Sequence, residues 1–292
     1  MTRAAGKTGA GPTVTVAIEQ HYPAPQRVLD DSLAYRMLPA AMRPVVWMTT
    51  PAFMRDWFVK SLEKPAPGIW GGILVRKRYI DAKLVESAGH VAPVVDLGAG
   101  LDTRLYRLPE LGSVPAWEVD QPENIAVKRA ALTAALGTIP QHVTFVPVDF
   151  DREALGDALA RHGYAAGAVT FFILEAVTQY LTEAGIESVF GFLAIAAPGS
   201  RLAFTYVTKE FLDGTDTHGQ DKLRVRYVTK EKLWLWGMDP DAVAAFLARY
   251  GWRIVEHPTY ADLAQKYVAP TGRNLTSTPI ERMVYAEKLG GA

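Results

Sequence analysis

The segment VVDLGAGLDTR, residues 94–104, decides the fold of this chain. A short apolar run rich in valine leads directly into the turn Gly98–Ala99–Gly100. β-Branched residues favour strands, and glycine lets the backbone turn sharply and approach a ligand closely. The pattern therefore predicts a strand followed by a ligand-binding turn. In open α/β sheets such a turn lies at the carboxyl ends of the strands, where ligands bind.

The turn differs from the dinucleotide fingerprint G-x-G-x-x-G at its third glycine, because Thr103 stands there. That third glycine permits close packing of the helix on the strand. Its absence counts against a nicotinamide or flavin cofactor. A nicotinamide-dependent oxidoreductase and a non-catalytic ligand-binding protein stay open as alternative classes.

Further strand patterns follow towards the C-terminus, with helical patterns between them. The predicted strands are PVVDL, AWEVD, VTFVPVDF, AVTFFIL, RLAFTYV, WRIVEH and ERMVYAEK. The predicted helices include residues 122–136, 152–163, 182–197 and 239–251. Strands that alternate with helices of about 10 to 15 residues predict a mostly parallel sheet covered on both faces. We therefore expect a doubly wound α/β core over residues 91–292.

The N-terminal third reads differently. Residues 25–90 carry apolar side chains at three- and four-residue spacing, interrupted by proline and glycine, and show no clear strand. We expect them to form a helical cap on the core. Residues 1–24 begin with a stretch rich in Gly, Ala and Thr, and we expect this end to be flexible.

The composition excludes several partners. The 292 residues carry 31 Lys+Arg and 31 Asp+Glu, so no global field attracts nucleic acid or anionic lipid. There are no cysteines, no apolar leader segment at the N-terminus, and the longest apolar run, residues 189–197, is too short to span a membrane. We expect a cytoplasmic protein without a metal, because no His, Asp and Glu cluster has ligand spacing.

Acidic residues stand at or just after four successive predicted strands, and the first is the aspartate of VVDLGAG, Asp96. Asp120 ends the second strand, 20 residues after Gly100, where a carboxylate can accept the hydroxyls of a ribose. Asp149 and Phe150 end the third strand and suit the amino group and the face of an adenine. Glu175 follows the fourth strand. An ordered set of this kind behind a two-glycine turn is more specific than any single acid.

This set resembles the class I S-adenosylmethionine-dependent methyltransferases. More narrowly, it resembles the family of leucine carboxyl methyltransferases and bacterial polyketide carboxyl methyltransferases. The resemblance rests on residues 94–109, 118–123 and 174–182, on the segment ending at Phe150, and on RKRYID at 76–81. It covers roughly residues 25–290. It implies a seven-stranded Rossmann-like core and S-adenosyl-L-methionine as the cofactor.

The resemblance also implies roles for individual residues. Arg76 would hold the carboxylate of the cofactor's methionine moiety, since a guanidinium grips a carboxylate bidentately. The other implied cofactor contacts are Gly98, Ala99 and Gly100 as a backbone cradle, Asp120 with its neighbour Gln121 at the ribose, Asp149 and Phe150 at the adenine, and Glu175 at the amino group. Tyr180 would lie near the transferred methyl group and position the acceptor. Ala176 and Gln179 depart from the glycine and methionine that members of the family often carry there.

The acceptor is less well defined by the sequence. A carboxylate is ionised at neutral pH and needs no general base, which matches the lack of an obvious catalytic dyad. We expect carboxyl methylation of a small natural product of secondary metabolism, with a polyketide or phenolic hydroxyl as the alternative. Besides Tyr180, the substrate candidates are His218 and Trp236, which with Trp234 could close the acceptor pocket or pack the cap onto the core. The oligomeric state is open.

Overall fold

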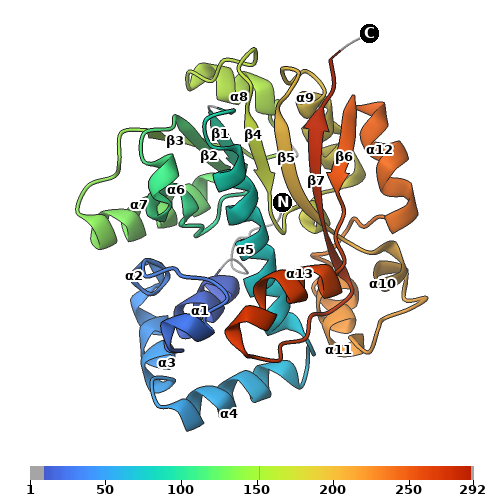
Figure 1. Cartoon of the computed structure of the whole chain (residues 1–292). Helices are drawn as coiled ribbons and strands as arrows, with labels where there is room; N and C mark the ends of the chain where they lie inside the picture. The colour runs from blue at the N-terminus through green and yellow to red at the C-terminus, as the bar shows by residue number, and fades with distance from the viewer. Residues whose placement is uncertain (1–9, 92, 151, 291–292) are drawn as a thin grey trace.

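A computed structural model describes residues 10–91, 93–150 and 152–290 (Figure 1). A seven-stranded sheet lies at its centre in the order β3-β2-β1-β4-β5-β7-β6. The strands are β1 Val94–Leu97, β2 Ala116–Asp120, β3 Val143–Pro147, β4 Phe171–Leu174, β5 Arg201–Val207, β6 Trp252–Glu256 and β7 Glu281–Lys288. Strands β1 to β5 pair in parallel, and β7 is antiparallel to both β5 and β6. The predicted doubly wound, mostly parallel sheet is confirmed.

The α-helices follow the predicted alternation. They are α1 Ala10–Glu19, α2 Ala34–Met37, α3 Arg43–Met48, α4 Ala52–Glu63, α5 Ile69–Ser87, α6 Arg104–Arg107, α7 Pro122–Leu136, α8 Leu155–Arg161, α9 Glu183–Leu193, α10 Lys209–Asp213, α11 Asp221–Arg224, α12 Val243–Arg249 and α13 Tyr260–Tyr267. Helix α7 matches its predicted bounds. Pro122 opens it where no N–H partner is needed, and Gly137 ends it at φ 81°.

Both faces of the sheet are covered, because successive side chains of a strand point to opposite faces. Val95 and Phe172 belong to one apolar cluster, with side chains of α8, α9 and α12. Val94 and Phe171 belong to another, with side chains of α1, α5 and α13. Figure 1 shows α5 running from the cap along the sheet, so that this one helix joins the two parts of the molecule.

The N-terminal segment differs from its prediction. Residues 1–9 lie outside the described residues, but Ala10–Glu19 forms a helix where we expected a flexible chain. Its valines, threonines, glycine and proline are weak helix formers, so local propensity does not explain it. Instead, Val16, Ala17 and Ile18 are buried, and α1 packs against α2 and α5. Tertiary contacts therefore stabilise this helix.

The cap also receives a part of the chain that the sequence did not assign to it. Helix α13, from the C-terminal region, packs against α5. Its Leu263 and Tyr267 share an apolar cluster with Leu74 and Leu84 of α5. In Figure 1, α13 lies beside α1 and α5, above α4. Segments from both sides of the expected boundary at residue 90 therefore pack against each other.

Gly98 occupies the tightest point of the turn after β1. Its φ is +81°, in the left-handed region, and a Cβ built on it would lie 2.3 Å from Cγ2 of Val177. Val177 belongs to the loop that follows β4, the neighbour of β1 in the sheet. The absent side chain at Gly98 therefore lets two ligand-binding loops lie against each other.

We predict that Gly98→Ala destabilises the protein by about 2–5 kcal/mol. A left-handed alanine costs about 1–2 kcal/mol, and the clash with a buried valine adds about 1–3 kcal/mol. Gly163→Ala is the matched control, because Gly163 has φ +82° but nothing lies within 4 Å of its Cβ position. Denaturant unfolding of both variants measures the difference. Equal destabilisation of Gly98→Ala and Gly163→Ala would show that the clash with Val177 adds nothing to the loss of stability.

Candidate active site

The loops after β1, β2 and β4 line a cavity of about 460 Å³ at the carboxyl edge of the sheet. We call it the donor cavity. Strand order reverses here, because β1 lies between β2 and β4. The cavity brings together seven residues singled out from the sequence, which are Arg76, Gly98, Ala99, Gly100, Asp120, Glu175 and Tyr180.

Asp120 fixes the conformation of the glycine turn. It is only 3% exposed, and its Oδ2 accepts a hydrogen bond of 2.7 Å from the Gly100 amide. Its Oδ1 accepts from the Gln121 amide and from Asn124 Nδ2, each at 2.7 Å. The carboxylate at the end of β2 thus holds the turn that follows β1 and faces the same cavity.

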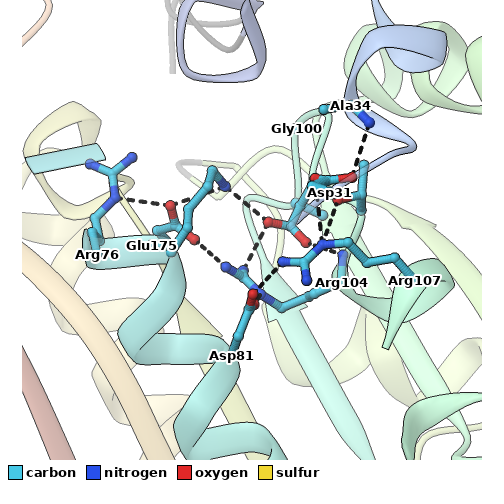
Figure 2. Close-up of polar contacts among 12 residues, drawn as sticks. Asp31, Ala34, Arg76, Asp81, Gly100, Arg104, Arg107 and Glu175 are labelled. Carbon is cyan, nitrogen blue, oxygen red and sulfur yellow. Dashed lines mark hydrogen bonds and ion pairs between the residues drawn. The ribbon is translucent and has the colours of Figure 1, made fainter. Parts of the chain in front are cut away.

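A network of buried charges lies beside the turn (Figure 2). Arg104 is 1% exposed, and its guanidinium contacts Asp81 at 3.1 Å, Asp102 at 2.9 Å and Glu175 at 2.7 Å. Lys77 Nζ lies 3.1 Å from both Asp102 and Glu175. These contacts connect α5, the loop after β1 and the end of β4. Cations and carboxylates alternate, so each buried charge has an opposite neighbour.

Arg76 lies at the edge of this network. Its Nε donates to Glu175 at 2.9 Å, and its Nη1 donates to Glu281 on β7 at 2.7 Å. The sequence suggested that Arg76 receives a cofactor carboxylate. In this structure two glutamates accept hydrogen bonds from these donors. Arg76 lines both the donor cavity and a second cavity, which is described below. Its part in cofactor binding stays a prediction.

The network separates the pKa values of neighbouring carboxyl groups. Burial, with the nearby Asp102 carboxylate, raises the pKa of Asp96 to about 8. Burial alone would also raise the pKa of Glu175, but Lys77 and Arg104 hold it well below its ordinary value. Asp96 Oδ2 is buried and has no hydrogen-bond partner among the described residues. The donor cavity therefore contains one carboxyl that is mostly neutral at pH 7 beside others that stay ionised.

A second cavity of about 580 Å³ adjoins the donor cavity and shares Pro12, Arg76, Ala176 and Tyr180 with it. We call it the acceptor cavity. Its walls are mostly apolar and include Phe58, Leu62, Ile73, Leu223, Tyr227 and Trp234. The rings of Tyr227 and Trp234 stack with centroids 5.0 Å apart. The polar side chains in its lining include Gln179, Lys222, Arg226 and Glu281.

Several predicted residues lie away from the two cavities. Gln121 follows β2. Asp149 and Phe150 were expected to end the third strand, but β3 ends at Pro147 and they lie in the loop after it. None of the three lines the donor cavity. Trp236 is 7% exposed and packs in the core against Phe246. His218 pairs with Glu210 at 2.8 Å and lines neither cavity. The substrate contacts suggested for Trp236 and His218 are therefore not found here, because Trp236 packs in the core and His218 is hydrogen-bonded to Glu210.

Other residues of the site were not singled out from the sequence. Asp102 and Arg104 stand in VVDLGAGLDTR, and Lys77 stands in RKRYID. Their position in these two motifs was the signal that could have identified them. Phe58 and Trp234 meet in the acceptor cavity from segments far apart in the chain. No local pattern predicts that meeting.

Two further findings concern the described residues only. None of their His, Asp or Glu side chains form a group of three or more that could hold a metal ion. None of the helices in residues 10–91, 93–150 and 152–290 is long and apolar enough to cross a membrane.

Comparison with known proteins places the chain in a family. The sequence profile of the leucine carboxyl methyltransferase family matches residues 10–194. A Mycobacterium marinum protein with the provisional name S-adenosyl-L-methionine-dependent methyltransferase is 31% identical over 247 residues, which cover 79% of this chain and 77% of that protein. A Mycobacterium tuberculosis H37Rv protein of the same provisional name is 29% identical and covers 88% of both chains.

Solved structures agree with the fold. A protein from Thermobifida fusca, provisionally described as a methyltransferase, matches with a TM-score of 0.57 at 19% identity, over 81% of this chain and 89% of that one. A DUF574 family protein from Streptomyces avermitilis matches with a TM-score of 0.55 at 15% identity, over 80% and 90% of the two chains.

The chain therefore belongs to the leucine carboxyl methyltransferase family. It is an S-adenosylmethionine-dependent methyltransferase with a class I fold. The donor cavity fits this cofactor. It offers the Asp120 carboxylate and the closely approachable backbone of the glycine turn for a nucleoside, charges of both signs for an amino acid, and Asp96 Oδ2, which has no hydrogen-bond partner among the described residues, as a further polar contact.

The raised pKa of Asp96 predicts a pH-dependent stability. A carboxyl whose pKa is raised on folding favours the folded state at low pH, and this contribution is lost as pH rises from about 4 to about 8. Asp96→Asn mimics the neutral form and lacks this loss. We expect the melting temperature of the variant, relative to wild type, to increase by several degrees between pH 5 and pH 8.

Asp157→Asn is the control, since Asp157 is exposed on α8. Its difference from wild type should stay constant over the same pH range. Thermal unfolding of the three proteins in matched buffers provides the measurement. Parallel pH profiles for wild type and Asp96→Asn would contradict the assignment of a neutral Asp96.

Asp120→Ala should weaken the binding of S-adenosylhomocysteine at least ~10-fold. The substitution removes a buried partner of the Gly100 amide and of the ligand, at about 1–3 kcal/mol. Glu123→Ala, three residues later and exposed, should bind like wild type. Calorimetric titration measures both. Unchanged affinity in a folded Asp120→Ala would remove this carboxylate from the donor site.

Proposed function

We propose that this enzyme methylates a carboxylate of a small, largely apolar molecule to give a methyl ester. The observation that carries the proposal is the junction of the two cavities at Arg76, Ala176 and Tyr180. A donor in the first cavity and an acceptor in the second would meet at this junction. Proximity and orientation of this kind can supply on the order of 7–11 kcal/mol of the barrier.

The described residues that line the two cavities include no histidine, which supports a carboxylate acceptor. All six histidines lie in the described part of the chain, and none lines either cavity. Glu175 and Glu281, the carboxylates nearest to Arg76, are both paired with it. An ionised carboxylate needs no proton removed, whereas a phenol or alcohol would gain from a base.

The residues of the donor cavity would hold the cofactor at both ends. S-adenosylmethionine, when bound, supplies a methyl group that its sulfonium already activates. The Gly98–Gly100 backbone and Asp120 would bind the nucleoside. Asp149 and Phe150, the residues expected at the adenine, do not line this cavity and are not part of the proposal. Glu175 would receive the amino group, and Arg76 with Lys77 would bind the carboxylate.

The chemical step is then an in-line displacement. The acceptor oxygen forms a bond to the methyl carbon as the carbon–sulfur bond breaks, and the electron pair of that bond stays on sulfur. No proton moves. In this proposal Tyr180, at the junction, positions the acceptor, and the apolar walls around Trp234 exclude water from its reactive end.

The proposal is tested by the chemical stability of the product. We expect purified enzyme with methyl-labelled S-adenosylmethionine and a panel of apolar aromatic and aliphatic carboxylic acids to give a product that releases labelled methanol in mild alkali. An ester hydrolyses under these conditions and an ether does not. Labelled product that resists alkali, from phenolic analogues in the same panel, would establish a hydroxyl acceptor instead.

Two variants connect this activity with the acceptor cavity. Trp234→Ala removes an aromatic wall and should raise the KM for the acceptor about 10-fold, a loss of about 1.4 kcal/mol, with unchanged S-adenosylhomocysteine affinity. Leu235→Ala is the neighbouring control, because Leu235 is 51% exposed. Equal KM values for the two variants would place the acceptor elsewhere.

A further inference from the structure

A third cavity, of about 630 Å³, lies apart from the donor and acceptor cavities and shares no lining residue with them. It is formed by the segment after α1, by α5, by the end of α6 and by α13 with the turn that follows it. Arg78 of α5 lines it. Arg78 follows Arg76 by two residues, which places the two side chains on different sides of the helix. The motif RKRYID therefore serves two cavities.

The charges in this cavity do not balance. Its basic side chains are Arg27, Arg78, Arg107 and Lys266, and its acidic ones are Asp30 and Asp31. Arg27 pairs with Asp30 at 2.9 Å, and Arg107 lies 3.4 Å from Asp31. Two positive charges remain in excess, although the whole chain has a formal net charge of zero.

The excess charge belongs to Arg78 and Lys266. Arg78 forms no hydrogen bond or ion pair with the described residues, and its guanidinium lies 5.8 Å from the ring centroid of Tyr267. Lys266 Nζ lies 5.3 Å from the same ring, and its closest carboxylate contact is an exposed one with Glu86 at 3.9 Å. Tyr267 is only 9% exposed. Arg78 and Lys266 thus both lie near the same buried ring.

Another wall of the cavity is held together by ion pairs and hydrogen bonds. Arg107 forms an ion pair with Asp81, which in turn binds the buried Arg104 of the donor-site network (Figure 2). Asp31 accepts hydrogen bonds from the Thr103 hydroxyl at 2.5 Å and from the Ala34 amide at 3.0 Å. These contacts hold the polar groups of that wall in place before any ligand arrives, which lowers the entropic cost of binding.

We propose that this cavity is a binding site for a small molecule that carries an oxyanion, a phosphate or a carboxylate group. Arginine binds such groups through two parallel N–H···O bonds, and a lysine beside it adds a point charge. Arg78 and Lys266 are the primary contacts. Tyr267 supplies an apolar ring beside the anion. The site is independent of the proposed carboxylate acceptor.

The test is calorimetric titration with inorganic phosphate and, separately, with citrate, at constant ionic strength in a buffer without other oxyanions. We expect saturable binding of at least one of the two anions. Whichever binds more tightly distinguishes a phosphate from a carboxylate ligand. No saturable heat from either anion would overturn the proposal.

Variants assign the binding to this cavity. Arg78→Ala and Lys266→Ala should each weaken it at least ~10-fold, and the double variant should abolish it. Arg36→Ala is the matched control, because Arg36 is exposed on α2 outside all three cavities, and it should bind like wild type. S-adenosylhomocysteine titration and thermal unfolding confirm that each variant is folded. If Arg78→Ala and Arg36→Ala weakened anion binding equally, the effect would come from the general loss of positive charge. That result would overturn the proposed site.

Discussion

The buried guanidinium of Arg104 is the contact on which the active site depends. It binds carboxylates from three parts of the chain, which are Asp81 of α5, Asp102 of the loop after β1, and Glu175 at the end of β4. A fully buried arginine is unfavourable unless it is paired in this way. Removing one member of this network would leave buried charges of the remaining members without an opposite charge beside them. The position of the cap helix, the turn and the sheet edge are therefore interdependent.

In the proposed function, the network would let the enzyme use one edge of its sheet for two different ligands. On the donor side, alternating charges suit a cofactor with a carboxylate, an amino group and a nucleoside. On the acceptor side, the walls are mostly apolar, and the charges of Arg76 and Glu281 are paired with each other. Under the proposal, shape and apolar contact would select the acceptor, and the paired charges would control where its reactive end lies.

Much of the fold followed from the sequence, because its elements are locally well marked. Strand β2 and helix α7 have the bounds that the pattern predicted, and for α7 an opening proline and a closing glycine are local signals. Helix α1 was missed because its residues favour helix weakly and long-range burial stabilises it. Trp236 was a candidate substrate contact, with packing of the cap onto the core as the alternative. In the structure Trp236 packs against Phe246, and Trp234 lines the acceptor cavity.

The sequence by itself determined the family, the parallel core and the strand-end positions of Gly98, Gly100, Asp120 and Glu175, because parallel strands bring their carboxyl ends to one edge. Only the tertiary structure decided which charges pair and which stay unpaired. Arg76 and Arg78 belong to one short motif, yet one is held between two glutamates and the other faces a separate cavity without a carboxylate partner among the described residues. That distinction depends on α13, β4 and β7, which the chain brings to α5 from far along its length.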